Sequence, residues 1–354
     1  MLNNFKLKNA VCLITGLLCV LLLSACGSNS AFLNEKYSGD KSDPDNDTVR
    51  IGYFGQIYES PLLAAYEQGY FKKSGINVEM IKINDKDIKN EYIAEKLDAV
   101  TADYRFFKYI EEGLPVKVTA GLNAGCIRII VPNDSKITGL NQLKDVKMGV
   151  EDLGDGTMVL TSMLLKGNRL DTGSGFSWKP YRSDGYIKAF ENGVIDAACI
   201  WEPSEKDSVI LNNEFRTLYT NINTEASGTK SSGHNHGSAL HFTRTFTGIS
   251  AGLVDENPEK AIFITKAWLQ GAGWVSENNE AAAKLLTEKK YVPGSQDENL
   301  NALASYMWTI GVASAKPNIK YLVKEQKKNG ILKENLNEAD FFKKVFAGVM
   351  PEFY

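Results

Sequence analysis

"TVRIGYF" stands at residues 48–54 and has the length and the β-branched, aromatic composition of a buried strand. "SPLLAAYEQGYFKKSG" follows at residues 60–75, where Ser60 and Pro61 are helix-start signals and Gly75 is a helix-stop signal. "INVEMIKI" at residues 76–83 then has the pattern of a second strand. A strand, a helix and a strand in this order form a βαβ unit, so we expect an α/β fold with parallel strands.

The same alternation continues through the next part of the chain and supports the α/β class. Further strands are predicted at residues 98–102, 116–122, 126–132, 146–151, 178–181 and 196–202. Helices are predicted at residues 91–97, 104–112, 140–143, from Thr157 onward, and at 186–192. From Pro258 the pattern is almost wholly helical, which predicts a helical C-terminal region.

The first 25 residues have the pattern of an export signal. Lys6 and Lys8 precede an apolar run from Ala10 to Leu23, which is shorter than the roughly 20 residues of a membrane-spanning helix. An uncleaved anchor helix is the alternative. The residues Leu-Ser-Ala-Cys at 23–26 resemble a bacterial lipobox, which implies cleavage before Cys26 and acylation of Cys26 with fatty chains such as palmitate. Residues 26–47 are polar and predict a flexible stalk.

Composition narrows the possible functions of the exported chain. The sequence has 40 Lys and Arg against 43 Asp and Glu, and this mildly acidic balance argues against nucleic acid as a partner. Five cysteines are present, but Cys12 and Cys19 lie in the leader and Cys26 is the predicted lipid site. Cys126 and Cys199 remain, as buried apolar side chains, as ligand contacts or as a disulfide.

Four further segments carry a resemblance to a known family. They are "AYEQGYFKKSGINVE" at 65–79, "EGLPVKVTAGL" at 112–122, "LKDVKMGV" at 143–150 and "ENGVIDAACIWEP" at 191–203. Their order and spacing resemble those of the periplasmic-binding-protein-like solute receptors of the nitrate, sulfonate and taurine group. The resemblance implies a type II fold with two lobes and a two-strand hinge. Lobe one is expected at 48–122 and 249–354, lobe two at 127–245, and the hinge crossings at 123–126 and 246–248.

The resemblance also implies a function. It predicts the solute-binding component of an ABC importer, held by its lipid anchor on the extracytoplasmic face of the cell membrane. Such a receptor captures a small polar organic or anionic solute between its lobes and delivers it to the permease and its ATPase. It needs no catalytic residue and no cofactor, and we expect a monomer.

The ligand site is expected at the carboxyl ends of the strands, where open α/β sheets bind their ligands. Several loops there end at a helix start, whose free N–H groups and dipole favour an anion. Glycines in one loop would let the backbone approach a ligand closely. The predicted ligand-binding residues are Gln56, Tyr58, Ala102, Asp103, Asn123, Cys126, Gly154, Gly156, Thr157, Trp201 and Glu202.

Two observations leave alternatives open. Six carboxylates fall on these loops, so the ligand could instead carry an amino group or a cationic ring: Glu59, Asp103, Glu151, Asp152, Asp155 and Glu202. The nearby arginines are expected to be Arg128 and Arg182. The three histidines cluster as His234, His236 and His241, which is compatible with a metal-binding receptor. A surface enzyme with Cys126 as thiolate and a histidine as base is the third possibility.

Overall fold

The computed structural model describes residues 48–84, 88, 96–124, 127–172, 176–181, 185–201, 214–220 and 243–351. The chain forms a compact unit that begins at Thr48. The leader, the stalk with Cys26, the hinge residue Cys126, Glu202 and the three histidines lie outside the described residues.

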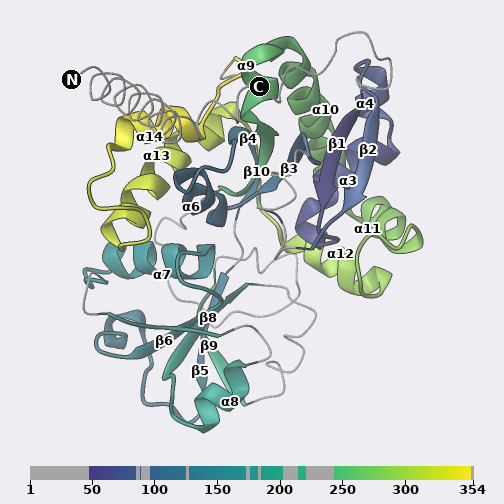
Figure 1. The fold of residues 1–354 in the computed structure, drawn as a ribbon. Helices are drawn as coiled ribbons and strands as arrows, with labels where there is room; N and C mark the ends of the chain where they lie inside the picture. Colours follow the sequence, from purple (N-terminus) through teal and green to yellow (C-terminus); the bar gives the residue numbers. More distant parts are fainter. Residues whose placement is uncertain are drawn as a thin grey trace, which may run out of the picture. The chain divides into compact units, whose positions relative to one another are not determined.

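A six-stranded sheet, called here the first sheet, contains the predicted βαβ unit (Figure 1). Strand β1 pairs in parallel with β2 and with β3, as predicted for βαβ units. Strand β10 is antiparallel to β3 and β4, and β11 is antiparallel to β4. In spatial order the strands are β11 (Trp308–Gly311), β4 (Val116–Ala124), β10 (Thr243–Ser250), β3 (Ala99–Ala102), β1 (Val49–Tyr53) and β2 (Val78–Lys82).

A five-stranded sheet, the second sheet, is also mixed. Strand β6 is parallel to β7 and β8, whereas β5 is antiparallel to β8 and β9. In spatial order the strands are β7 (Ser177–Pro180), β6 (Lys147–Val150), β8 (Ala197–Trp201), β5 (Ile127–Pro132) and β9 (Phe215–Thr220).

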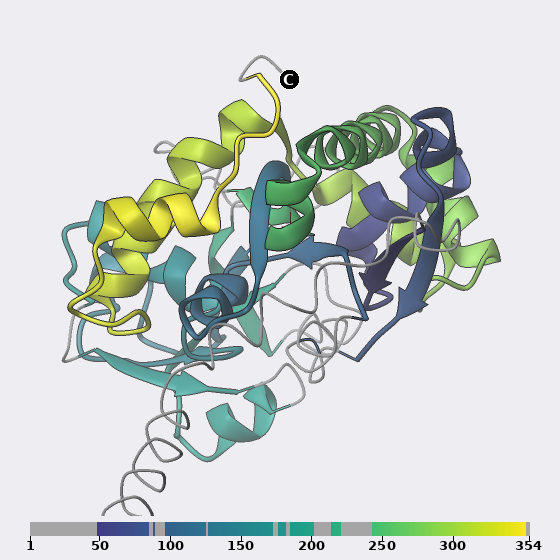
Figure 2. The same ribbon diagram turned by 45° about the horizontal axis from the view of Figure 1, so that its top comes forward.

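Helices cover both sheets. Figure 2 shows α13 and α14 in yellow on one side and α10 in green on the other, and all three helices contact β4, the second strand from the edge of the first sheet. Neighbouring residues of β4 point to opposite faces of the sheet, which explains this arrangement. Thr119 hydrogen-bonds to Thr265 of α10, and Val118 forms an isolated β-bridge with Phe346, which follows α14. The helices are α3 (Ser60–Glu67), α4 (Tyr70–Lys73), α6 (Arg105–Glu111), α7 (Gly156–Gly167), α8 (Tyr186–Glu191), α9 (Ala251–Glu256), α10 (Pro258–Glu277), α11 (Asn279–Glu288), α12 (Gln296–Ser305), α13 (Val312–Lys328) and α14 (Glu338–Val345), with 3-10 turns η2 (Ile57–Glu59) and η4 (Leu140–Gln142).

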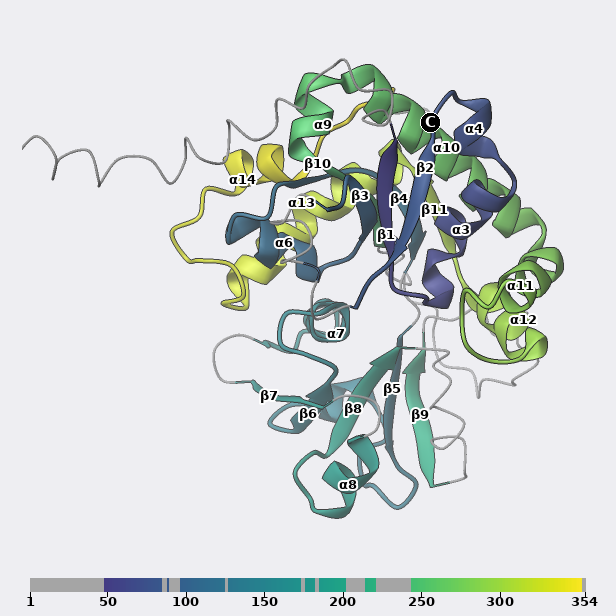
Figure 3. The same cartoon turned by 45° about the vertical axis from the view of Figure 1, so that its right-hand side comes forward.

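The two sheets share a continuous hydrophobic core through α7 and α13. Its buried members include Val118 of the first sheet, Ile129 of the second sheet, Met163 of α7 and Leu322 of α13. Figures 1 and 3 show α7 between the strands of the second sheet and the helices of the first. Among the described residues, no helix has the length and apolar character needed to span a membrane.

The α/β class is confirmed, but the prediction of parallel sheets was wrong in part. A chain that returns from the second sheet enters the first sheet as β10, which runs against its neighbours. Residues 246–248, predicted as a crossing, therefore lie inside this sheet, where Phe246 pairs with Ala102 and Gly121. The C-terminal region also contains strand β11, and the predicted helix after Ser60 is interrupted at Gly69, which has φ 69°.

Candidate functional site

The loop after β1 is built around a buried carboxylate. Glu59 has no solvent exposure and accepts backbone hydrogen bonds from Phe54 at 2.9 Å, Gly55 at 2.8 Å and Gln56 at 3.0 Å. Gly55 has φ 83°, a left-handed conformation that glycine adopts without a steric penalty. The N–H groups of this loop were predicted to be available to an anionic ligand, but Glu59 already occupies them.

The start of α7 is also capped by a carboxylate of the chain itself. Asp155 accepts from the Met158 backbone N–H at 3.0 Å and from the Thr157 hydroxyl at 2.7 Å. Burial, and next the charge of Glu151, raise the pKa of Asp155 from 3.8 to about 7. A carboxylate here satisfies helix N–H donors that a ligand would otherwise use.

Side chains from both sheets meet beside this helix start. If Gly156 carried a Cβ, that atom would stand 2.4 Å from Trp201 Cη2 at the end of β8 and 2.4 Å from Tyr104 Cδ2 before α6. Only glycine fits between these two rings. Tyr104 is held from its other end, because its hydroxyl donates to the carbonyl of Thr243 at 2.7 Å.

Arg244 of β10 adds a positive charge to the same place. Its guanidinium carbon lies 3.8 Å from the ring centre of Trp201 and 5.1 Å from that of Tyr58. The Asn123 amide of β4 donates to the Tyr58 carbonyl at 3.2 Å. We call these six residues the inter-sheet cluster: Tyr58, Tyr104, Asn123, Gly156, Trp201 and Arg244.

The cluster rests on a contact between α7 and α13. Gln326 of α13 is fully buried, and its amide nitrogen donates to the carbonyls of Tyr104 at 2.8 Å and Gly154 at 3.3 Å. Gly154 has φ 85°, and a Cβ there would be 2.6 Å from Ile331. An ion pair of 2.8 Å between the exposed Lys166 of α7 and the buried Glu325 of α13 also joins the two helices. Figure 3 shows α7 below the end of α13.

Four of the predicted ligand-binding residues lie in the inter-sheet cluster: Tyr58, Asn123, Gly156 and Trp201. Thr157 and Gly154 lie next to the cluster, but both already have partners within the chain. The Thr157 hydroxyl donates to Asp155 and accepts the backbone N–H of Glu151, and the Gly154 carbonyl accepts from Gln326. Gln56 is solvent-exposed. Cys126 and Glu202 lie outside the described residues, and the ligand role of every residue in this set stays a prediction.

The remaining two predicted residues end strand β3. Ala102 is buried and pairs with Phe246. Asp103 bonds to Arg105, with an ion pair of 2.5 Å. Glu59 accepts backbone N–H groups, Asp103 is paired with Arg105, and the raised pKa of Asp155 favours its neutral form, which weakens the case for a cationic ligand.

Sequence reasoning missed Arg244 and Tyr104. Arg244 stands in "TRTFTGIS" at residues 243–250, where threonines alternate with larger residues. This period of two is typical of a strand and could have predicted β10. The expectation that Arg128 and Arg182 were the nearby arginines was therefore incomplete.

Both alternatives stay predictions, because the residues they depend on lie outside the described residues: Cys126, His234, His236 and His241. Cys199 is a free, buried thiol, so of the three alternatives left open for it the structure favours a buried apolar side chain over a disulfide. Burial raises the pKa of Cys199, which favours the unreactive thiol over the thiolate. Within the described ranges, no group of three or more His, Cys, Asp or Glu side chains is placed to hold a metal ion.

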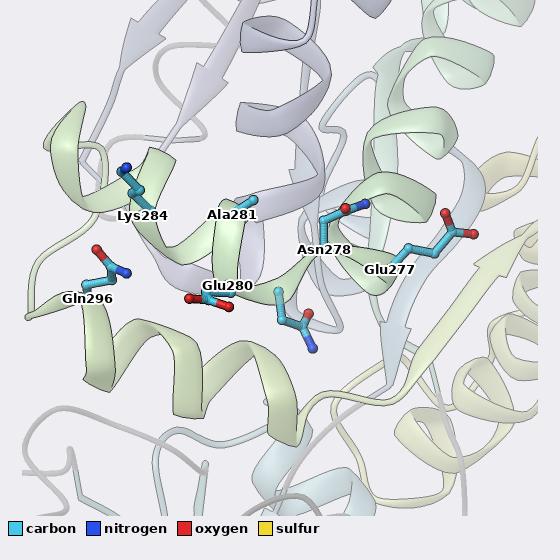
Figure 4. A pocket seen from close by; sticks show the side chains of 7 residues that line it. Glu277, Asn278, Glu280, Ala281, Lys284 and Gln296 are labelled. Atoms are coloured by element: carbon cyan, nitrogen blue, oxygen red, sulfur yellow. The ribbon is translucent and has the colours of Figure 1, made fainter.

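A surface cavity of about 470 Å³ lies where α10 meets α11, near the start of α12 (Figure 4). Its lining residues are Glu277, Asn278, Asn279, Glu280, Ala281, Lys284 and Gln296. This lining is polar and of mixed charge, whereas small-molecule sites are usually apolar with a few placed polar groups. None of the predicted ligand-binding residues lines this cavity.

Comparison with known proteins shows which proteins this chain resembles. Residues 42–214 match the model of the NMT1-like family. A Bacillus subtilis protein named for binding aliphatic sulfonates is 26% identical over 314 residues, covering 79% of each chain.

Solved structures share the architecture. The periplasmic aliphatic sulphonate binding protein SsuA of Escherichia coli matches with a TM-score of 0.64 and 13% identity, over 85% of this chain and 92% of its own. The periplasmic nitrate-binding protein NrtA of Synechocystis PCC 6803 matches with a TM-score of 0.63 and 16% identity, over 85% and 86%. This chain has the periplasmic-binding-protein fold.

The predicted resemblance to the nitrate and sulfonate receptors is thereby confirmed, and so is the two-sheet α/β architecture. The inter-sheet cluster combines Arg244 of the first sheet and Tyr58 of η2, which follows β1, with Trp201 of the second sheet.

Proposed function

We propose that this chain is the solute-binding component of an ABC importer and captures a small polar organic or anionic solute at the inter-sheet cluster. The observation that carries the proposal is the convergence of Trp201, from the second sheet, on Arg244 and Tyr104, from the first. A ligand that contacts both sheets stabilises their closed arrangement, and a permease can then distinguish loaded from empty receptor. The names of the Bacillus, Escherichia and Synechocystis proteins support a sulfonate or nitrate-like solute.

The proposal includes two lobes that rotate about two crossings. The outward passage runs from the end of β4 at Ala124 to the start of β5 at Ile127, so the first two of the predicted residues 123–126 lie inside β4. For the return, β9 ends at Thr220 and β10 begins at Thr243, so the passage between the sheets precedes the predicted residues 246–248. Small-angle scattering tests this motion: saturating ligand should reduce the radius of gyration, and an unchanged radius would contradict it.

The proposal also includes a lipid anchor at Cys26 on the extracytoplasmic face of the membrane. Two thioether-linked acyl chains and an amide-linked one would hold the receptor stably at the bilayer. Cys26→Ser should therefore leave an exported chain in the aqueous phase after detergent partitioning. A variant that still partitions and acylates like the wild type contradicts the anchor but not the receptor function.

A thermal-shift screen followed by calorimetry tests solute binding. Its panel holds nitrate, alkanesulfonates, taurine, pyrimidines and metal ions, and a bound solute raises the melting temperature by mass action. Tyr58→Ala and Trp201→Ala should each weaken the best solute at least about tenfold, since rings supply much of a site's apolar contact area. Trp178→Ala, a tryptophan of β7 outside the cluster, is the control and should leave the affinity unchanged.

A surface enzyme is the alternative, and alkylation separates the two. A thiol-alkylating reagent should abolish turnover by a Cys126-dependent enzyme. It should leave the fold and most of the solute binding of a receptor intact.

A further inference from the structure

Arg244 is the arginine of the inter-sheet cluster whose hydrogen-bond donors are unused. Within the described residues its guanidinium makes no hydrogen bond and no ion pair, while it lies over the rings of Trp201 and Tyr58. The neighbouring Arg105 is paired with Asp103 instead. Arg216 of the second sheet donates to the carbonyls of Ser135 and Ile137.

The charged groups around Arg244 have other partners. Asp103 bonds to Arg105, Glu59 accepts three backbone N–H groups, and Asp155 caps α7. Burial, and next the charge of Glu59, raise the pKa of Tyr58 well above its usual value, so the Tyr58 phenol is neutral and supplies no counter-charge. Arg244 therefore brings a positive charge whose partner must come from outside the described chain.

Two rings restrict how that partner can approach. A guanidinium over an aromatic face gains cation–π attraction there, and its N–H donors point outward in its own plane. Those planar donors match two oxygens of a carboxylate, sulfonate or phosphate group. A neutral or cationic solute cannot supply this match and would leave the half-buried charge without a partner.

We propose that Arg244 determines specificity at this site by binding the oxyanion head of the solute while the Trp201 and Tyr58 rings hold its guanidinium. This inference rests on the proposed function and narrows the solute to an oxyanion. Arg244 lies in β10 of the first sheet and its guanidinium contacts Trp201 of the second, so the residue that binds the anion also joins the two sheets. The same side chain, Arg244, would thereby select the charge of the solute and stabilise the closed arrangement of the two sheets.

Calorimetry with two probes of similar shape tests the inference on the full mature chain. The probes are butanesulfonate, which is anionic, and butyl methyl sulfone, which is its uncharged analogue. The wild type should prefer the sulfonate by roughly 30-fold or more, as expected for a charge pair that loses one partner. Arg244→Gln should abolish most of this preference, and Arg244→Lys, which keeps the charge but not the planar donors, should retain part of it.

Arg169→Gln is the matched control, because Arg169 is exposed at the opposite end of α7. This variant loses the same charge and should keep the wild-type preference. A preference that survives in Arg244→Gln, or a wild type that binds the sulfone as tightly as the sulfonate, overturns the inference while leaving solute binding intact. A wild type that binds only neutral or cationic members of the panel overturns it in the same way. Binding of no member at all counts against the proposed function as well.

Discussion

Gly156→Ala tests whether the inter-sheet cluster is as tightly packed as its geometry indicates. The added methyl group would stand 2.4 Å from Trp201 Cη2, 2.5 Å from Trp201 Cζ2 and 2.4 Å from Tyr104 Cδ2. Ordinary contacts between such carbons are about 3.5–4.0 Å, so one or both rings must move. The Tyr104 ring is buried, whereas the Trp201 ring is partly exposed. Trp201 can therefore move toward solvent, but it would then lose its contact with Arg244.

The expected magnitude combines three contributions. Overpacking costs about 1–3 kcal/mol, and loss of the Trp201 to Arg244 contact adds about 0.5–1 kcal/mol. Alanine has a higher helix propensity than glycine, which stabilises α7 by up to about 1 kcal/mol and offsets part of this loss. The free energy of unfolding should therefore fall by about 0.5–4 kcal/mol in urea titrations, with a change in the near-ultraviolet circular dichroism of the tryptophans.

A control and a double-mutant cycle isolate the ring contact. Gly167→Ala makes the same change at the other end of α7, where nothing lies within 4 Å of the new methyl group, and it should leave stability unchanged or raise it. In a Trp201→Leu background the cost of Gly156→Ala should shrink by about 1 kcal/mol or more. Equal effects at the two glycines, or zero coupling to Trp201, would refute the packing described here.

Three further substitutions probe the supports of the site. Gln326→Leu removes the donor of the Tyr104 and Gly154 carbonyls and should lower the free energy of unfolding by about 2–4 kcal/mol in urea; a loss below about 1 kcal/mol contradicts this role. Glu59→Gln leaves the N–H groups of the loop without a charged acceptor and should cost about 1–3 kcal/mol, and an unchanged urea midpoint would argue against it. The raised pKa of Asp155 favours the protonated folded state, so its contribution is full below pH 4 and falls as the pH rises to about 7. Asp155→Asn should remove that pH dependence from thermal melts between pH 4 and 8, and identical profiles for variant and wild type would contradict it.

The parts of the fold that local pattern determines could be predicted. β1, β2, β3 and β5 are short apolar runs between turn signals, and their bounds agree with prediction to within about two residues. β10 was not predicted as a strand. Its partners, β3 and β4, precede it by more than a hundred residues, and nothing local says that the chain returns to the first sheet.

Some residues of the candidate site could likewise be predicted from local sequence pattern, and others could not. Tyr58 and Trp201 could be found because each follows or ends a strand, where ligands of α/β sheets bind. Arg244 and Gln326 could not, since their importance depends on which rings and carbonyls surround them after folding. The acidity of the loops is visible in the sequence, but the hydrogen bonds of Glu59 and Asp155 to backbone N–H groups depend on the folded loops and could not be predicted.

Because Glu59 and Asp155 hydrogen-bond to the backbone, an anionic solute cannot bind these N–H groups directly. Both the loop after β1 and the start of α7 would offer backbone N–H groups to an anion, yet each is filled by a carboxylate of the chain. An anionic solute at either place would have to displace a buried carboxyl group and break the hydrogen bonds that this group accepts. Recognition by Arg244 needs no such displacement, because the guanidinium donors are already free in the described structure. We therefore expect an anion to bind at the guanidinium of Arg244, beside the Tyr58 and Trp201 rings, at a lower cost in free energy than at either loop.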